Sequence, residues 1–103
     1  MRVSVVFTPE AEAQLLSLYR FIAARATPAV AQRYVSGMIE YCESLRTFPH
    51  RGMRRDDIRP GLRITNFRKR VVVAFAVDQD RVEIIGVFYG GRDFETALAE
   101  EAV

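Results

Sequence analysis

The chain has 103 residues, half of them hydrophobic and 11% aromatic, so a single domain with one apolar core is expected over residues 1–103. One cysteine, Cys42, excludes an internal disulfide, and one histidine, His50, excludes a His/Cys zinc cluster, so no metal or other cofactor is expected. No stretch has the length and apolarity of a membrane span, and the first residues lack the features of a signal peptide. We therefore expect a cytoplasmic protein without membrane association.

The net charge of +2 conceals an uneven distribution of basic residues. Between Arg51 and Arg70 there are eight basic residues and two acids, which gives a local net charge of +6. All but one of the 15 basic residues are arginine, whose planar guanidinium suits phosphates and carboxylates. This segment is interpreted either as a surface for an acidic protein or nucleic acid, or as a solvated loop that also receives carboxylates of a partner.

The first elements predicted along the chain are a short strand and two helices. Residues 3–7 form an apolar, β-branched run that ends at Thr8-Pro9. Because Thr8 is a suitable N-cap and proline suits the first helical position, a helix is predicted from about 9 to 25. The same pattern at Thr27-Pro28 predicts a second helix, which ends at Phe48-Pro49. Because only a very short link joins the two predicted helices, they are expected to form an antiparallel helical hairpin.

The second half of the chain predicts a sheet. A polar connection over 50–61 ends in Pro60-Gly61, a suitable centre for a type II turn because glycine accepts a positive φ. Three strands follow, over 62–67, 71–77 and 81–89. The short polar segment 78–80 makes the last two a hairpin. The run 71–77 has almost no polar alternation, so it is predicted to be a central strand covered on both faces.

A short acidic helix is expected from Phe94 to Glu101. The whole is predicted to be an α+β domain in which the helical hairpin packs on one face of a mainly antiparallel sheet. Gly90-Gly91 is expected to form a turn that residues with side chains would not tolerate. For Arg92-Asp93, a target-contacting pair and an internal salt bridge both remain open, and Arg63 is expected either to pair with Asp93 or to face a target.

The order of these elements and three local patterns resemble the ParE/RelE superfamily of toxins from bacterial type II toxin-antitoxin systems. The patterns are FTPEAEAQLLSLYRFIA, RPGLRI and VEIIGVFYGGRD. They are similar to the strand-then-helix opening, the Gly-Leu-Arg turn and the final Gly-x-Arg-Asp of that superfamily, and together the resemblance covers about residues 3–98. It implies a toxin held inactive by an antitoxin encoded beside it, whose C-terminal segment wraps the toxin in a hetero-oligomer.

The resemblance leaves two target classes open, because RelE-like toxins cut mRNA in the ribosome whereas ParE-like toxins poison DNA gyrase. Where a RelE-like nuclease has a catalytic arginine and a tyrosine, this chain has Val72 and Leu98. Arg92 alone matches a catalytic arginine, with Tyr89 as a substitute proton carrier if the chain is a nuclease. The incomplete set favours a ParE-like gyrase inhibitor that is not an enzyme. A ribosome-dependent mRNA endonuclease and a non-toxic, antitoxin-binding remnant of the fold are the alternatives.

Two sets of site residues follow from this interpretation. The residues expected to bind the target are Arg59, Arg63, Arg68, Lys69, Arg70 and Arg92. Several large apolar residues of the predicted hairpin lie outside a single core stripe, which indicates either a seam between the two helices or a groove for a partner helix. The residues expected to bind a ParD-like antitoxin of the ribbon-helix-helix type are Leu16, Tyr19, Val35, Ile39 and Arg63.

Overall fold

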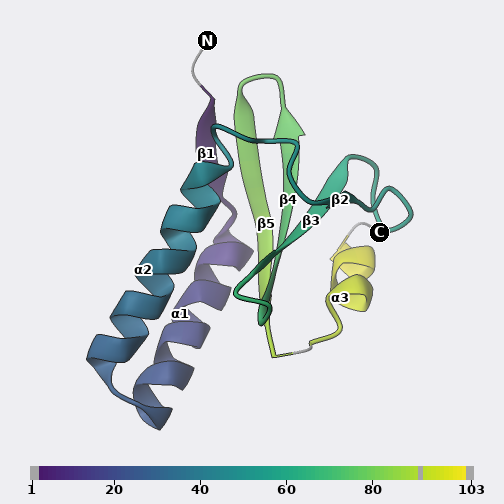
Figure 1. Ribbon diagram of the computed structural model, residues 1–103. Helices are drawn as coiled ribbons and strands as arrows, with labels where there is room; N and C mark the ends of the chain where they lie inside the picture. The colour runs from purple at the N-terminus through teal and green to yellow at the C-terminus, as the bar shows by residue number, and fades with distance from the viewer. Residues whose placement is uncertain (1–2, 91, 102–103) are drawn as a thin grey trace.

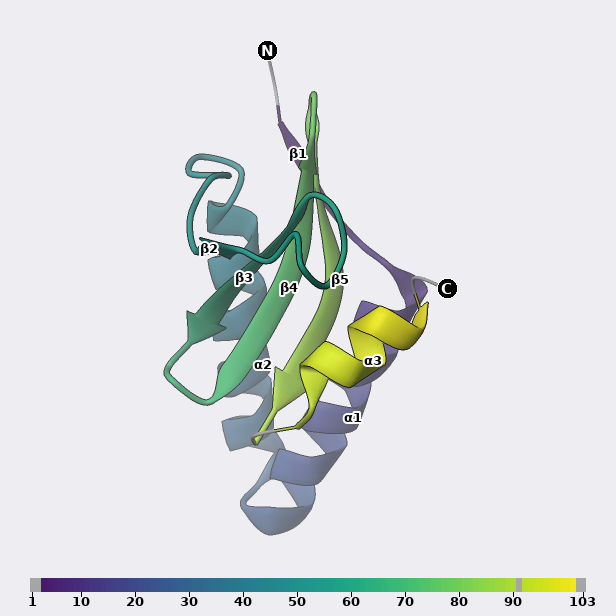
Figure 2. The ribbon, with the colours of Figure 1, turned by 90° about the vertical axis from the view of Figure 1, so that its right-hand side faces the viewer.

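The structure is a computed structural model that describes residues 3–90 and 92–101, and it has three layers (Figure 1). A hairpin of two helices covers one face of a five-stranded sheet, and a short C-terminal helix lies on the other face, as Figure 2 shows from the side. In chain order the elements are β1 (Ser4–Phe7), α1 (Pro9–Arg25), α2 (Pro28–Ser44), β2 (Met53–Arg54), β3 (Leu62–Phe67), β4 (Val71–Asp78), β5 (Arg81–Tyr89) and α3 (Phe94–Glu101). The predicted α+β architecture is therefore confirmed.

The strands lie in the order β1-β5-β4-β3-β2, with β1 parallel to β5 and the other neighbours antiparallel. The predicted apolar strand, β4, is the middle strand. Its Val73 and Phe75 pack under the helical hairpin, whereas Ala74 packs under α3. The prediction that this strand is covered on both faces is confirmed, and the absence of polar alternation in its sequence follows from that burial.

Both helices of the hairpin begin as the sequence predicts. The Thr8 hydroxyl accepts a hydrogen bond from the Ala11 N–H at 3.1 Å, and the Thr27 hydroxyl accepts one from the Val30 N–H at 3.1 Å. Thr8 also donates to the Ile85 carbonyl at 3.1 Å, so the cap that starts α1 fixes the helix to β5. Each cap satisfies a backbone donor that the first helical turn leaves without a partner.

Two predicted boundaries are wrong. α2 ends at Ser44, before Phe48-Pro49, because the chain tightens into i to i+3 hydrogen bonds such as that from the Leu45 N–H to the Cys42 carbonyl at 3.1 Å. The polar connection contains the short strand β2, in which Met53 pairs with Ile64. At its other end the Arg59 carbonyl accepts from the Leu62 N–H at 3.1 Å and Gly61 has φ of 82°, as the predicted turn requires.

Two apolar clusters hold the layers together. The larger one joins the helical hairpin to the sheet and includes Leu15, Leu18, Met38 and Phe75. The smaller one lies under α3, where Leu98 is fully buried against the sheet. Burial of one leucine side chain stabilises by about 1.5–3 kcal/mol, so Leu98 contributes to holding α3 on the sheet, together with Phe94 and Ala97. None of the helices in the described ranges is long and apolar enough to cross a bilayer.

Candidate partner-binding surface

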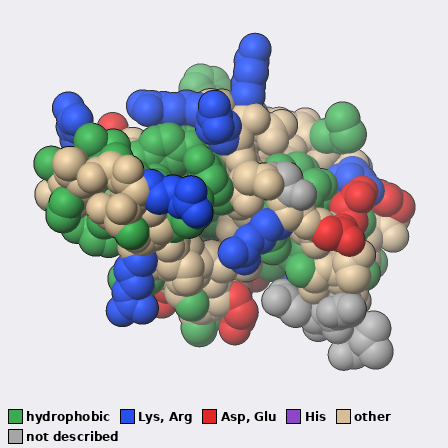
Figure 3. Space-filling model, turned by 90° about the horizontal axis from the view of Figure 1, so that it is seen from below, with side chains coloured by type: hydrophobic (Ala, Val, Ile, Leu, Met, Phe, Trp, Pro, Cys, Tyr) green, Lys and Arg blue, Asp and Glu red, His purple; other side chains and the backbone are tan. Residues whose placement is uncertain are grey.

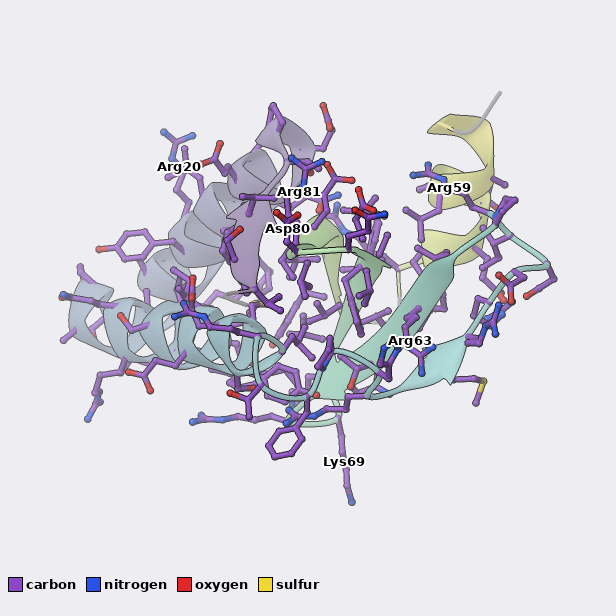
Figure 4. All side chains as sticks on the ribbon, turned by 90° about the horizontal axis from the view of Figure 1, so that it is seen from above. Arg20, Arg59, Arg63, Lys69, Asp80 and Arg81 are labelled. Carbon is purple, nitrogen blue, oxygen red and sulfur yellow. The ribbon has the colours of Figure 1, made fainter. Side chains whose placement is uncertain are left out.

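The hairpin turn between β3 and β4 presents three consecutive cations, Arg68, Lys69 and Arg70. The Arg70 N–H donates to the Phe67 carbonyl at 3.2 Å, and the two central residues have φ of 52° and 60°. This is the backbone of a type I′ turn, in which Asn-Gly is favoured because both central residues are left-handed. The chain instead has two cationic side chains there, despite their steric cost in this conformation. Lys69 points away from the body of the molecule (Figure 4).

Arg68 is held against aromatic rings of the hairpin face. Its guanidinium carbon lies 5.5 Å from the centroid of the Tyr34 ring and 5.0 Å from that of Phe67. Burial is the main cause of a raised pKa of Tyr34, so this phenol stays neutral at physiological pH. Its hydroxyl is buried and has no hydrogen-bond partner among the described residues.

The end of β5 lies beside this turn. Val71 pairs with Tyr89, and the Gly90 N–H donates to the Arg70 carbonyl at 3.2 Å. Gly90 has φ of 71°, which glycine adopts readily, so the predicted turn is confirmed there, while Gly91 lies outside the described residues. Arg92 follows and is exposed, so the chain places it at the same end as Arg70.

A groove of about 380 Å³ opens at this end, between α1 and β5. It is lined by Ala13, Gln14, Ser17, Leu18 and Phe21 of α1 and by Val87, Tyr89, Gly90 and Arg92 of the final strand and its extension. The ring centroids of Phe21 and Tyr89 are 5.8 Å apart, and the Arg25 guanidinium carbon lies 4.5 Å from the Phe21 centroid. Seen from below, basic side chains surround an exposed apolar area (Figure 3). We call this surface, formed by Arg25, Arg68, Lys69, Arg70 and Arg92 with the groove, the basic end.

The other two predicted target-binding arginines are used inside the fold. Arg63 donates from Nη2 to the His50 carbonyl at 2.6 Å and from Nε to the Arg51 carbonyl at 3.2 Å. Arg59 donates to the Leu98 carbonyl of α3 at 3.1 Å. Figure 4 shows Arg59 beside α3, whereas Arg63 lies on β3 beside the loop that follows α2, and Lys69 points away from both. The structure therefore brings together four of the six predicted residues and separates Arg59 and Arg63 from them.

Of the two alternatives left open for Arg63, the pairing with Asp93 is wrong, because each residue has another partner. Asp93 accepts from the Thr96 N–H at 3.1 Å and from the Thr96 hydroxyl at 2.6 Å, so it caps α3. These two hydrogen bonds lower the pKa of Asp93. Arg55 links the loop to α3. It forms two hydrogen bonds of 2.9 Å with Asp57 of the loop and an ion pair with Glu95 of α3.

The residues predicted to receive an antitoxin helix differ in exposure. Leu16 and Ile39 are exposed, at 49% and 38%. Tyr19 is half-buried, and Val35 packs partly against the main core, so it supports the fold as well. Phe21 was among the apolar residues outside the core stripe but was not assigned to either binding set, and it is 42% exposed and lines the groove of the basic end. The available signal was its spacing of four residues from Arg25, which places the two side chains together on one helix.

Val72 and Leu98, where the resemblance implies an arginine and a tyrosine in a nuclease, lie in an apolar environment. Val72 packs against the cluster under α3, in which Leu98 is buried. Tyr89 packs on the opposite side of the sheet, against the main core. Burial also raises the pKa of the Cys42 thiol to about 12, which removes it as a nucleophile at neutral pH. Within the described ranges, no three histidine, cysteine or acidic residues form a metal-binding group.

Comparison with known proteins agrees with this fold. The family model for the ParE toxin of the type II toxin-antitoxin system, parDE, matches residues 5–94. Comparison with curated proteins gives no significant match. A chain of the chromosomal ParDE system from P. aeruginosa shares 21% identity with a TM-score of 0.75, over 86% of this chain and 97% of that one. A chain of the RelBE2 toxin-antitoxin complex from Mycobacterium tuberculosis shares 19% sequence identity with a TM-score of 0.63, over 89% of this chain and 95% of that one. Since the family model spans nearly the whole chain, this protein belongs to the ParE toxin family of type II toxin-antitoxin systems.

Proposed function

We propose that this toxin inhibits DNA gyrase and is neutralised in the cytoplasm by a ParD-like antitoxin. The observation that carries the choice of target is the position of Val72 and Leu98 in the apolar cluster under α3. Cleavage of RNA requires groups that activate the 2′-hydroxyl and protonate the leaving oxygen. Apolar side chains packed against a covering helix supply neither, and a gyrase inhibitor needs only a binding surface.

The basic end is the proposed target-binding surface. Arg68, Lys69, Arg70 and Arg92 are exposed, and they adjoin the partly exposed rings of Phe21 and Tyr89. Arginine and aromatic side chains dominate the energetics of protein interfaces, because they combine large contact area with directional hydrogen bonds. The target set is accordingly reduced to these four cations, without Arg59 and Arg63.

The helical hairpin is the proposed antitoxin-binding surface. Leu16 and Ile39 present exposed aliphatic side chains, and Tyr19 and Val35 add partly buried ones. An amphipathic helix binds such a surface by laying its own apolar face along it. Arg63 is removed from this set because its guanidinium donates to the backbone of the loop.

The proposed target is tested by adding the purified chain separately to a gyrase supercoiling and cleavage assay and to a cell-free translation reaction. The expected result is loss of supercoiling or accumulation of cleaved DNA, reversed by the antitoxin, with translation intact. Ribosome-dependent cuts in mRNA would instead assign the chain to the nuclease class. A folded chain that is silent in both assays but binds the antitoxin would be a non-toxic binding module.

The antitoxin surface is tested with the double variant Leu16→Asp and Ile39→Asp. Antitoxin affinity should fall by at least about tenfold, since two apolar contacts are replaced by solvated charges. Phe48→Asp is the matched control, because Phe48 is a large apolar residue that is 62% exposed and lies outside the hairpin. Equal losses in both variants, with thermal unfolding unchanged, would place the antitoxin helix elsewhere.

A further inference from the structure

The acidic residues of the chain are absent from the segments that surround the β3–β4 turn. Along the helical hairpin no aspartate or glutamate occurs between Glu12 and Glu40, and along the sheet none occurs between Asp57 and Asp78. The end of β5, residues 84–90, has none either. These three segments contain most of the basic residues that the fold leaves exposed, so their charge has a single sign.

Aromatic contacts bring the three acid-free segments together. The ring centroid of Tyr34 on α2 lies 5.6 Å from that of Phe67 on β3 and 6.4 Å from that of Tyr89 on β5. The Gly90 N–H then donates to the Arg70 carbonyl at 3.2 Å, which fixes the end of β5 beside the turn. The segments therefore form one side of the molecule, and a surface with one sign of charge attracts polyanions over a distance.

The three cations of the turn are available to such a ligand. Arg68, Lys69 and Arg70 are all exposed. Among the described residues, every ion pair is made by an arginine outside this turn. Asp93, the acid next to Arg92 in the sequence, is engaged in capping α3. The charge of the turn is thus not neutralised within the fold.

The shape of the turn suits a groove of duplex DNA. The turn lies at the outer edge of the ribbon in Figure 2 and is the tip of a two-stranded hairpin. Neighbouring strands lie about 4.8 Å apart, and the major groove, about 12 Å wide, admits a two-stranded ribbon. The hydrogen bond from the Arg70 N–H to the Phe67 carbonyl satisfies the backbone of the tip. Its side chains can therefore bind a ligand without loss of the turn.

The directions of the cations favour a row of phosphates over a single carboxylate. The Arg68 guanidinium lies against α2, where a Cβ atom at Gly37 would be 3.6 Å from its Nη2. Lys69 instead points away from the body of the molecule (Figure 4). Cations that diverge in this way cannot converge on one side-chain carboxylate. Duplex DNA carries one negative charge per about 1.7 Å of its axis, so each cation can meet a separate phosphate.

We propose that the tip of the β3–β4 hairpin binds the sugar-phosphate backbone of duplex DNA, through Arg68, Lys69 and Arg70. The proposal rests on the proposed function, because the duplex is the one on which gyrase acts. The toxin would then hold the enzyme and its DNA together. Phosphate contacts carry no sequence information, so duplexes of unrelated sequence should bind equally.

A salt titration with a short fluorescent duplex and the purified toxin tests this contact. The logarithm of the binding constant should fall linearly with the logarithm of salt concentration, by about 0.9 per phosphate contact. The variant with Arg68, Lys69 and Arg70 changed to Gln should lose about 2.7 of this slope, and Lys69→Gln alone about 0.9.

The matched control changes Arg51, Arg54 and Arg55 to Gln, because it removes the same charge from the loop. It should leave the slope unchanged. Equal losses of slope in the two triple variants, or no binding of the duplex at low salt, would overturn the inference. Two competitors test the ligand class. Polyglutamate that competes as well as unlabelled duplex would assign the tip to an acidic protein, and inorganic phosphate that competes equally would assign it to a free anion.

Toxin affinity for gyrase, measured with and without duplex, separates this inference from the proposed function. Duplex should raise the affinity at least about tenfold, and the turn variant should lose that gain. Gyrase inhibition with the same affinity in both conditions would overturn the inference and leave the proposed target in place. Salt-dependent duplex binding through the turn without any inhibition of gyrase would keep the DNA contact and contradict the proposed function.

Discussion

The basic end and the loop from Arg51 to Arg63 are both rich in arginine, yet the fold uses them differently. Arg63, at the start of β3, donates to two backbone carbonyls of the loop, and Arg55 in the loop binds Asp57 and Glu95. At the basic end, Arg70 and Lys69 are exposed on a turn. A cluster of arginines in a sequence is therefore not in itself a binding surface, because its meaning depends on the acceptors that the fold brings within reach.

The difference follows from the backbone of each region. The loop has little regular structure, so its carbonyls need donors from elsewhere, and a guanidinium with five N–H groups can serve several. The β3–β4 turn satisfies its own backbone through the hydrogen bond from Arg70 to Phe67. Its cationic side chains are not required for that bond. The turn is thus free to present them to a partner.

Removing the charges of the turn should have the largest effect on function. In the variant with Arg68, Lys69 and Arg70 all changed to Gln, gyrase inhibition should weaken by about a hundredfold, since single interface hot spots contribute about 2 kcal/mol. The supercoiling assay measures this loss. The free energy of unfolding should change by no more than about 1 kcal/mol, the usual size of an exposed cation-aromatic contact such as that of Arg68.

The matched variant replaces Arg51, Arg54 and Arg55 of the loop with Gln and removes the same charge. It should lower stability, because Arg55 loses its ion pairs with Asp57 and Glu95, while inhibition by the folded fraction persists. If both triple variants reduced inhibition equally, general charge attraction would explain the effect and the distinction between the two regions would fail.

Arg63→Ala should have the largest effect on stability. It removes two charged hydrogen bonds to the His50 and Arg51 carbonyls, so the free energy of unfolding should fall by about 2 kcal/mol. Denaturant titration measures the change. Arg63→Lys separates charge from geometry, because a single ammonium group cannot reproduce the planar fork that reaches both carbonyls. A lysine variant as stable as the original chain would show that charge alone is sufficient at this position.

A substitution in the strained β3–β4 turn should have a smaller effect on stability than Arg63→Ala, and of opposite sign. Replacing Arg68-Lys69 with Asn-Gly fits the two positive φ angles, 52° and 60°, and should stabilise the fold by about 1 kcal/mol. Thermal unfolding detects this gain. Inhibition should nevertheless fall, because two cations are lost. A variant that gained stability and kept full inhibition would show that these side chains are not part of the target surface.

Most element boundaries were predictable because they depend on local chemistry. The Thr-Pro pairs fix the starts of α1 and α2, and the apolar run of β4 follows from its burial on both faces. The strand β2 was not predictable, because it depends on its pairing with β3, which is distant in the sequence. At Gly52, whose φ is 82°, a Cβ atom would lie 2.3 Å from the Ile64 carbonyl oxygen. Such an approach requires glycine but leaves no periodic pattern in two residues.

The candidate site was predictable only in part for a similar reason. Arg63 and Arg68 are five residues apart in the same strand and turn, and their side-chain type is identical. What separates them is the loop folded back beside Arg63, which supplies the carbonyls of His50 and Arg51. The groove likewise depends on α1 lying beside the unpaired end of β5. Neither relation is encoded in local spacing.

The smallest expected effect is a difference in acid sensitivity between the loop with α3 and the β3–β4 turn. Hydrogen bonds from Gly61 and then Arg54 lower the pKa of Asp56 in the loop, and those from Thr96 lower the pKa of Asp93 at α3. Because each folded-state pKa lies below the ordinary value of 3.8, both carboxylates contribute stability above that pH and lose it as the pH falls through the folded-state values.

Below about pH 4, amide exchange should therefore increase first in α3 and the loop, while the β3–β4 hairpin stays protected. Both carboxylates are exposed, so the effect is modest. Asp93→Asn is the control, since it should remove the acid sensitivity of α3 and retain that of the loop. Equal acid sensitivity of the hairpin turn would mean that its stability also depends on carboxylates, and the contrast between a charge-supported loop and a self-sufficient turn would be lost.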